Sequence, residues 1–344
     1  MGQSAYTRFM HGPRTILPNP RQHPRFSGIA TFGRYPLFDH VPGEYRPVDW
    51  AIYGVPFDSG VTYRPGARFG PRAIRAESQY LKPYHLVHDV TVTDVLSLAD
   101  AGDSPVCPYD CEANAKAVAE FAGQLGEPRH TKLLALGGDH SIALGNLRAT
   151  HARRHQRGPM GLIHFDSHLD TVDRVWDEGY GHASPFIRAI EEKLIDPARM
   201  LSIGIKGPLN TKKDLDYARD HGVTVLTCEE VRHRGTAEIA AFLKRLGDSE
   251  SYLTFDVDVV DPAFAPGTGT PSVGGFTSGE ALGLLRVLAD GGGDGPPPNI
   301  VGGDVVEVLP DRDPGGITAL LAAHVAFEVL ALDALRVVRG RGRH

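Results

Sequence analysis

The sequence predicts a three-layer α/β/α domain built on a mostly parallel β-sheet. Strand-like apolar runs alternate along the chain with segments of helical period, which is typical of parallel sheets. The strand-like runs are almost continuously apolar, as expected for strands that helices cover on both faces. From residue 46 to residue 344 no shift in composition separates two domains, so we expect one domain there.

The strand-like runs share a core of Val, Ile, Leu and Phe, and most end in Gly, Asp or another turn residue. They lie at residues 49–57, 132–138, 160–166, 200–205, 223–227, 252–260 and 299–308. The helical segments place apolar residues three or four positions apart. They lie at residues 70–81 (with Pro71 in the first turn), 111–125, 211–222, 236–248, 278–290 and 317–338.

Residues 1–45 are rich in Pro, Arg and His without periodicity, so we expect an extended N-terminal arm. The formal net charge of −6 argues against a nucleic-acid partner. We expect no membrane partner, because no uninterrupted apolar run approaches the roughly 18–20 residues that span a bilayer. The three cysteines, Cys107, Cys111 and Cys228, are scattered and odd in number, which favours a cytoplasmic protein over a disulfide-linked secreted one.

Three strand-like runs end in residues of the types that bind metals. In a parallel sheet these ends meet at one edge, where sites gather. The runs LLALGGDHS, GLIHFDSHLD and LTFDVDVVD supply six candidate ligands: His140, Asp166, His168, Asp170, Asp256 and Asp258.

The spacing of these ligands predicts that they converge. Side chains at positions i, i+2 and i+4 of extended backbone point the same way, which applies to Asp166, His168 and Asp170. Four carboxylates packed together repel one another, and two divalent cations would balance them. Oxygen-rich ligands with some imidazole suit Mn²⁺. Two such ions about 3.5–4 Å apart can share a hydroxide that acts as a nucleophile at neutral pH.

Two further residues are candidates for the chemistry. His182, in YGHASPF, could protonate a leaving amine near pH 7, or it could be an ordinary surface histidine. Glu307, in GGDVVEVLP, could bind a planar cationic group, or it could be a surface carboxylate or a helix cap. Each short motif alone is more often structural than functional. Their combination at the strand ends of one sheet favours a two-metal hydrolase.

The chain resembles the ureohydrolases, the arginase and agmatinase family, and most of all their agmatinase and guanidinobutyrase branch. The segments that carry the resemblance extend over roughly residues 48–330 and are GVTYRPGARFGPRAIR, GGDHS, HFDSHLDT, GHASPF, FDVDVVDPAFAPGTGTP and GGDVVEVLP. The resemblance implies that residues 46–344 are a single arginase-like catalytic domain with a dinuclear manganese centre. It implies hydrolysis of a guanidinium C–N bond to urea and an amine, by a homotrimer or homohexamer.

The family's motifs assign roles position by position. One metal would be held by His140, Asp166, Asp170 and Asp256, and the other by His168, Asp166, Asp256 and Asp258. Asp170 would also orient the hydroxide and relay its proton. His182 corresponds to the proton-shuttling histidine, and Glu307 to the carboxylate that binds the guanidinium group.

The chain departs from the family's usual residues at three places. Ser167 stands where Ala is usual, and His182-Ala183-Ser184 replaces His-Gly-Thr. The loop between the motifs carries the bulky Trp176, which we expect to contact the substrate tail. These changes leave the substrate open between agmatine, a guanidino acid and free guanidine, for which nickel could replace manganese. A single-zinc deacetylase-like hydrolase is a further alternative, in which Asp258 and His140 would have no role.

Overall fold

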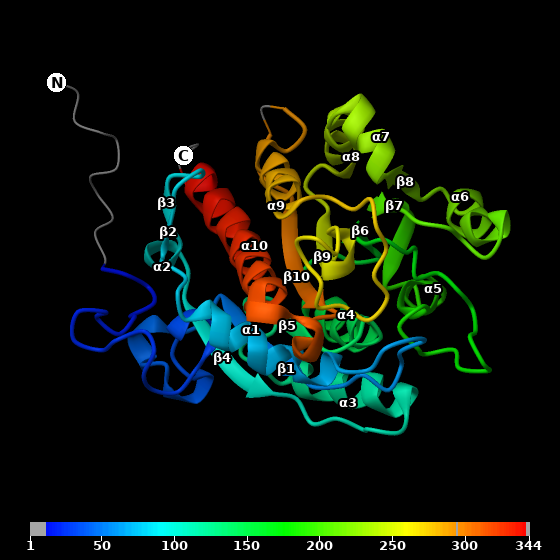
Figure 1. Cartoon of the computed structure of the whole chain (residues 1–344). Helices are drawn as coiled ribbons and strands as arrows, with labels where there is room; N and C mark the ends of the chain where they lie inside the picture. The colour runs from blue at the N-terminus through cyan, green and yellow to red at the C-terminus, as the bar shows by residue number, and fades with distance from the viewer. Residues whose placement is uncertain (1–11, 294, 342–344) are drawn as a thin grey trace.

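A computed structural model describes residues 12–293 and 295–341, and its centre is an eight-stranded sheet (Figure 1). The strands follow the order β4-β1-β5-β10-β9-β6-β7-β8, and every neighbouring pair is parallel. Their bounds are β1 (Trp50–Val55), β4 (Leu98–Asp103), β5 (Lys132–Gly137), β6 (Met160–Phe165), β7 (Ile195–Ile205), β8 (Thr224–Thr227), β9 (Glu250–Asp256) and β10 (Asn299–Val306). Outside this sheet, β2 (Tyr84–His85) and β3 (Val90–Thr91) form a short antiparallel pair.

Helices cover both faces of the sheet, as the apolar strands require (Figure 1). Along β6, Ile163 packs into a cluster with α8, α9 and α10, whereas the adjacent Leu162 packs into a cluster with α4 and α5. The helices are α1 (Gly70–Ser78), α2 (Val92–Val95), α3 (Cys111–Gly123), α4 (Ile142–Arg153), α5 (Pro185–Glu191), α6 (Asp216–Asp220), α7 (Cys228–Arg234), α8 (Ala237–Leu246), α9 (Ser278–Val287) and α10 (Ile317–Arg341). The predicted three-layer α/β/α fold is confirmed.

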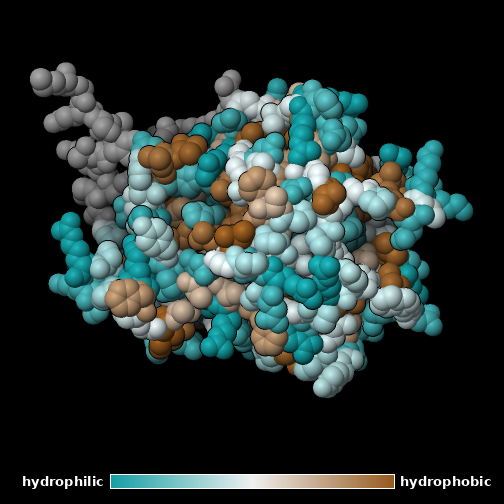
Figure 2. Space-filling view, viewed as in Figure 1, coloured by the Kyte–Doolittle hydropathy of each residue, from teal (hydrophilic) through white to brown (hydrophobic). Residues whose placement is uncertain are grey.

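Helix α10 is a core helix. Residues Pro314–Arg341 are long and apolar enough to cross a membrane by length and composition, although no uninterrupted apolar run was evident in the sequence. However, 72% of the most apolar window is buried inside the protein. Asp333 of α10 accepts hydrogen bonds from Trp50 Nε1 (2.8 Å) and Lys132 Nζ (2.6 Å), which join the helix to β1 and β5. On the face seen in Figure 2, apolar side chains surface in separate small groups among hydrophilic ones.

The described part of the N-terminal segment packs against the sheet edge. Residues 12–45 contain the 3₁₀ turns Phe32–Arg34, Phe38–His40 and Gly43–Tyr45 and no strand or α-helix. The N–H of Phe32 donates to Asp100 of β4 at 2.7 Å. The first eleven residues of the predicted arm lie outside the described residues.

The structure differs from the prediction at one strand end and in one additional strand. The strand predicted for residues 252–260 ends at Asp256, and a 3₁₀ turn (Val257–Val259) follows. The carboxylate of Asp256 accepts the N–H of Asp258 at 2.8 Å, and this bond turns the chain. The strand that includes Leu98–Asp103 was not predicted, because its sequence LADAGD is polar at its exposed end.

Candidate metal centre

Four neighbouring strands, β5, β10, β9 and β6, bring the predicted residues to one edge of the sheet. His140 follows β5, Asp166 follows β6, Asp256 is the last residue of β9, and Glu307 follows β10. These strands are the centre of the sheet, so the side chains that follow them are covered on both sides by helices. All six predicted ligands lie in this cluster.

The ligand atoms form two groups that share Asp166. In the first group, His140 Nδ1 lies 3.0 Å from Asp166 Oδ2, 2.8 Å from Asp170 Oδ2 and 3.4 Å from Asp256 Oδ2. In the second, His168 Nδ1 lies 3.1 Å from Asp258 Oδ2 and 3.4 Å from Asp166 Oδ1. Two groups of nitrogen and oxygen atoms that share one carboxylate are the arrangement expected of a two-metal site.

The convergence arises from turns, so the extended-backbone reason given for it was wrong. Strand β6 ends at Phe165, before the first ligand. The carboxylate of Asp166 then accepts the N–H of His168 at 2.6 Å, and Asp170 has a left-handed φ of 51°. In both motifs an aspartate therefore folds the turn with Oδ1 and directs Oδ2 toward His140.

The electrostatics of the cluster call for cations. Burial, and then the charges of Asp258 and Asp166, raise the pKa of Asp256 well above its usual value. Burial and the charge of Asp166 likewise raise the pKa of Asp170. Ionised carboxylates this close together are costly to bury without counter-charge.

His140 gives an independent test of the fit. Its Nδ1 is buried and lies near three carboxylate oxygens, yet it makes no hydrogen bond with any of them. Its Nε2 is occupied by the hydroxyl of Thr254 at 2.8 Å. A nitrogen without a partner among carboxylate oxygens fits a divalent metal ion, so the residues present suit the predicted cofactor.

His182 and Glu307 form a pair beside the cluster. His182 Nδ1 lies 2.8 Å from Glu307 Oε1, which also accepts the N–H of His140 at 2.9 Å. The second oxygen, Glu307 Oε2, is buried and has no hydrogen-bond partner among the described residues. Burial lowers the pKa of His182, but the charges of Glu307, Asp139 and Asp170 outweigh it and raise the pKa to about 9.

The other ring nitrogen of His182 faces the loop that follows β1. The N–H of Thr62 donates to His182 Nε2 at 2.9 Å, and Thr62 Oγ1 lies 2.7 Å from the same atom. The backbone N–H favours a neutral ring and Glu307 favours a charged one. The imidazole is thus held between two opposing influences.

Residues 48–332 match the model of the arginase family. The chain belongs to the arginase family.

Similar relatives cover almost the whole of this arginase-family chain. It is 42% identical over 309 residues to proclavaminate amidinohydrolase of Streptomyces clavuligerus, covering 89% of this chain and 94% of the relative. It is 42% identical over 318 residues to guanidinopropionase of Pseudomonas aeruginosa (92% and 95%) and 40% identical over 314 residues to guanidinobutyrase of the same organism (90% and 93%). The predicted ureohydrolase membership is confirmed.

Solved structures give the same result. The structure of proclavaminate amidinohydrolase from S. clavuligerus aligns with a TM-score of 0.81 at 40% identity, covering 91% of this chain and 99% of that chain. A hypothetical agmatinase from Burkholderia thailandensis aligns with a TM-score of 0.77 at 35% identity (92% and 93%). Arginase-family enzymes depend on a dinuclear metal centre, and the described residues include groups that could hold such ions.

The side chains of two of the three departures, Ser167 and Trp176, lie away from the ligand atoms. Ser167 Oγ donates to the carbonyl of Asp258 at 2.8 Å and accepts from Lys206 Nζ at 2.6 Å, so it joins the two turns from behind. Trp176, predicted to contact substrate, is 81% exposed and lines a cavity of about 170 Å³ with residues 59–62, Gly181, Ala183 and Ser184. The structure does not bring Trp176 into the cluster.

Sequence reasoning missed His164 and Thr62. His164 Nε2 lies 2.9 Å from Asp166 Oδ2, and its Nδ1 lies 3.1 Å from Ser202 Oγ. The alternation His-X-Asp-X-His-X-Asp begins one step earlier than the predicted ligands, which is the signal that could have identified His164. Thr62 lies in the quoted segment GVTYRPGARFGPRAIR but has no chemistry that spacing alone would reveal.

A second histidine cluster does not favour a metal. His85, His88 and Glu328 lie within reach of one ion. However, His85 Nδ1 accepts the N–H of His88 at 3.1 Å, so its Nε2 carries the proton that it shares with Glu328 at 2.9 Å. Arg286 Nε donates to the other oxygen of Glu328 at 2.7 Å. These contacts describe an ion-paired core cluster.

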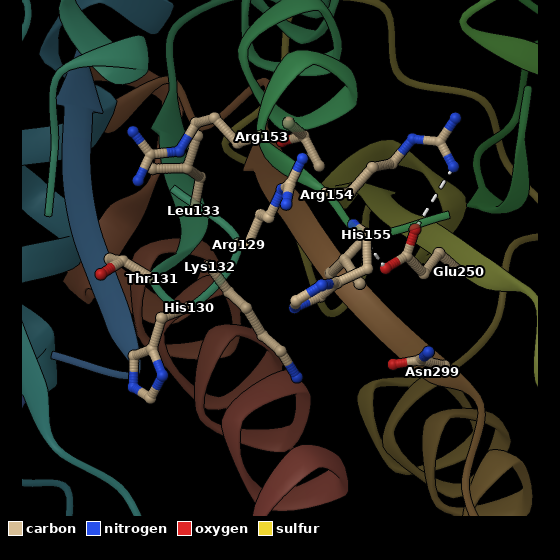
Figure 3. A pocket seen from close by; sticks show the side chains of 12 residues that line it. Arg129, His130, Thr131, Lys132, Leu133, Arg153, Arg154, His155, Glu250 and Asn299 are labelled. Atoms are coloured by element: carbon tan, nitrogen blue, oxygen red, sulfur yellow. Dashed lines mark hydrogen bonds and ion pairs between the residues drawn. The ribbon is translucent and has the colours of Figure 1, made fainter. Parts of the chain in front are cut away.

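A basic pocket of about 190 Å³ lies at the opposite edge of the sheet, where β5, β9 and β10 begin (Figure 3). Its most buried cations have partners. Arg154 bonds to Glu250, as the dashed line shows, and Lys132 bonds to Asp333. Arg153 donates to carbonyls at the end of α3, including that of Gly123 at 2.6 Å. This pocket is therefore explained by the packing of strands and helices and holds none of the predicted site residues.

Proposed function

We propose that this chain hydrolyses the C–N bond of a small guanidino compound, agmatine or a guanidino acid, to urea and an amine. The observation that carries the proposal is the free, buried oxygen of Glu307 beside a cluster of four carboxylates and two imidazoles. A cationic planar group is what such an oxygen would bind, and the cluster that we propose as the hydrolytic centre lies next to it.

The cofactor we propose is a pair of divalent ions, with manganese first and nickel as the alternative. His140, Asp166, Asp170 and Asp256 would hold one, and His168 and Asp258 would complete the second with the shared Asp166 and Asp256. When bound, such ions lower the pKa of a coordinated water and offset negative charge that develops during hydrolysis.

Glu307 is proposed to bind the guanidinium group. Its Oε1 is already shared by two donors, so Oε2 is the oxygen free to accept substrate N–H groups. Gly269 leaves room beside it, because a Cβ at that position would lie 3.5 Å from Oε2 and 2.9 Å from the carbonyl of Arg64. A charge-assisted bond in this buried space would fix the plane of the substrate.

His182 is proposed to supply one of the protons that the leaving amine needs. Water and the guanidinium cation together give urea and a protonated amine (R–NH₃⁺), so both protons of the attacking water must end on the leaving nitrogen. We infer that Asp170 passes on one of these protons within the cluster. His182, whose pKa Glu307 helps to raise to about 9, would donate the other and regain a proton afterwards.

Free guanidine remains the alternative substrate, for which the products would be urea and ammonia. The test is urea release by purified, metal-loaded protein from agmatine, 4-guanidinobutyrate, 3-guanidinopropionate and guanidine, with manganese and nickel in parallel. Urea from one of the first three compounds supports the proposal. Urea from guanidine alone supports the alternative, and no urea from any of them contradicts both.

Assembly and location complete the proposal. We propose a homotrimer or homohexamer in the cytoplasm, with no nucleic-acid or membrane partner. Size-exclusion chromatography with light scattering would measure the mass of the assembly. A monomer at micromolar concentration would contradict this part and leave the proposed chemistry untouched.

A further inference from the structure

We propose that Thr254 and Asp304 are positioning residues, a buried relay that fixes the tautomer of His140 and so directs its Nδ1 lone pair at the metal. The inference rests on the proposed metal centre but does not depend on which substrate is hydrolysed. Asp304 belongs to the GGDVVEV segment, yet the proposed reaction gives it no role.

The relay is a short line of hydrogen bonds behind the metal site. His140 Nε2 lies 2.8 Å from Thr254 Oγ1, which lies 2.5 Å from Asp304 Oδ1. The other oxygen of Asp304 accepts the hydroxyl of Tyr252 at 2.5 Å. All four side chains are fully buried, so water does not compete for these bonds.

The position of each hydrogen follows from the donors and acceptors available. An ionised carboxylate only accepts, so Thr254 and Tyr252 each donate their single hydroxyl proton to Asp304. Thr254 can then only accept from His140, which places the ring proton on Nε2. His140 Nδ1 is left with a bare lone pair, the form that a metal binds.

The rest of the network agrees with this direction. The hydroxyl oxygen of Tyr252 accepts from Asn146 Nδ2 at 2.6 Å, and the same amide donates to the carbonyl of Gly303 at 2.8 Å. Asn146 Oδ1 in turn accepts the hydroxyl of Tyr53 at 2.8 Å. Every proton from Tyr53 to Asp304 therefore has an acceptor when the relay runs in this direction.

The reverse direction fits poorly. A proton on Asp304 would turn the Thr254 hydroxyl toward His140 Nε2 and place the ring proton on Nδ1. That proton would face three carboxylate oxygens 2.8–3.4 Å away and would leave no lone pair for a metal ion on the side of the ring where the ligands converge. Metal binding through Nδ1 thus requires the same tautomer that the relay behind the ring selects.

The sheet explains why the relay is rigid. Thr254 and Asp304 are paired across β9 and β10. Gly303 lets the strands approach closely, because a Cβ there would lie 2.5 Å from the carbonyl of Leu253.

By contrast, the side chain of His168 is 39% exposed, so water can orient it. His140 depends on the relay because no water reaches it.

The first test measures Mn²⁺ binding to metal-free protein without substrate. Calorimetry or electron paramagnetic resonance detects the bound ions. Thr254→Val keeps the shape and removes the hydroxyl, and we expect one of the two ions to bind about 10–100-fold more weakly. Thr254→Ser keeps the hydroxyl and should bind within about 3-fold of wild type. Tyr252→Phe removes a bond to the same carboxylate outside the relay and serves as the matched control, also expected within about 3-fold.

The second test needs no variant. The protein is labelled with ¹⁵N-histidine and loaded with diamagnetic Zn²⁺, and its long-range ¹H–¹⁵N correlation spectrum is recorded. The His140 signals are assigned by their loss in His140→Asn. They should show metal bound through Nδ1 and a proton on Nε2. Coordination through Nε2, wild-type Mn²⁺ affinity in Thr254→Val, or no Mn²⁺ binding by wild type would each overturn the proposal. Metal binding of the expected pattern without urea release would support the relay and contradict the proposed reaction.

Discussion

Replacing Glu307 with Gln tests the link between substrate binding and proton supply. The side chain is fully buried, and Glu307 Oε1 accepts from both the N–H of His140 and His182 Nδ1. A glutamine can keep its oxygen at this position, so the variant should fold and retain its metals. Its NH₂ group would then replace Oε2 and face the donors of the guanidinium group.

The size of the effect follows from the bonds that are lost. A hydrogen bond to a charged group contributes about 1.5–3 kcal/mol. At about 1.4 kcal/mol per factor of ten, kcat/KM should fall by about 10–150-fold. The carboxylate is also the leading influence that raises the pKa of His182 from 6.5 to about 9, so that pKa should fall in the variant.

The assay is urea release against pH at saturating Mn²⁺, with metal content measured on the same samples. Glu328→Gln is the matched control, because Glu328 is another buried carboxylate with a histidine partner, and its partners His85, His88 and Arg286 do not belong to the cluster. It should change the melting temperature and leave kcat/KM unchanged. A Glu307→Gln enzyme within 2-fold of wild type, or one that has lost its metals, would refute the reasoning.

Three further predictions concern the cluster and its surroundings. His182→Ala should keep both metals and lose about 10²–10⁴-fold in kcat, because it removes a proton donor and no ligand; loss of metal instead would contradict the role assigned to it. Asp256→Asn should keep the turn, since an amide oxygen can still accept the N–H of Asp258, yet bind metal far more weakly than wild type in a Mn²⁺ titration. Chelation of the metals at pH 8 should lower the melting temperature, because the buried carboxylates then lack a counter-charge. The difference in melting temperature between metal-loaded and metal-free protein should narrow toward pH 5. Asp256 and Asp170, whose pKa values are raised in the folded state, take up protons as the pH falls, so the metal-free protein regains stability. Melting curves measured by fluorimetry between pH 5 and pH 8 check this. A difference in melting temperature that stays constant with pH would contradict the role of these carboxylates.

The sequence allowed the fold and the ligand set to be predicted because both are local patterns. Buried parallel strands are continuous apolar runs, and Asp or His at their ends mark the edge where such strands meet. The residues at which β6 and β9 end could not be predicted as well from the sequence. In each case the strand ends where an aspartate caps its own turn, and a pattern of alternating residues does not distinguish such a turn from extended backbone.

The residues that support the site could not be predicted in this way. Thr62 reaches His182 across 120 positions, and Thr254 reaches His140 across 114. A threonine in an apolar strand is ordinarily a β-former, and its hydroxyl acquires a role only when a distant strand or loop is in place. Such roles follow from tertiary contacts, which single-chain periodicity does not contain.

The loop between Asp170 and His182 explains how the metal centre and the substrate preference can vary separately. Its ends are tied together where the N–H of Val172 donates to the carbonyl of Ala183 at 3.0 Å, and its tip closes on itself between Val175 and Glu178. The exposed Trp176 lies in that tip. The tip borders the cavity of about 170 Å³ that Thr62 also lines, so changes at the tip can reshape this cavity without altering a metal ligand. We infer that the tip adapts this arginase-family enzyme to its guanidino substrate, while the carboxylate-capped turns and the His140 relay keep the metal ligands fixed.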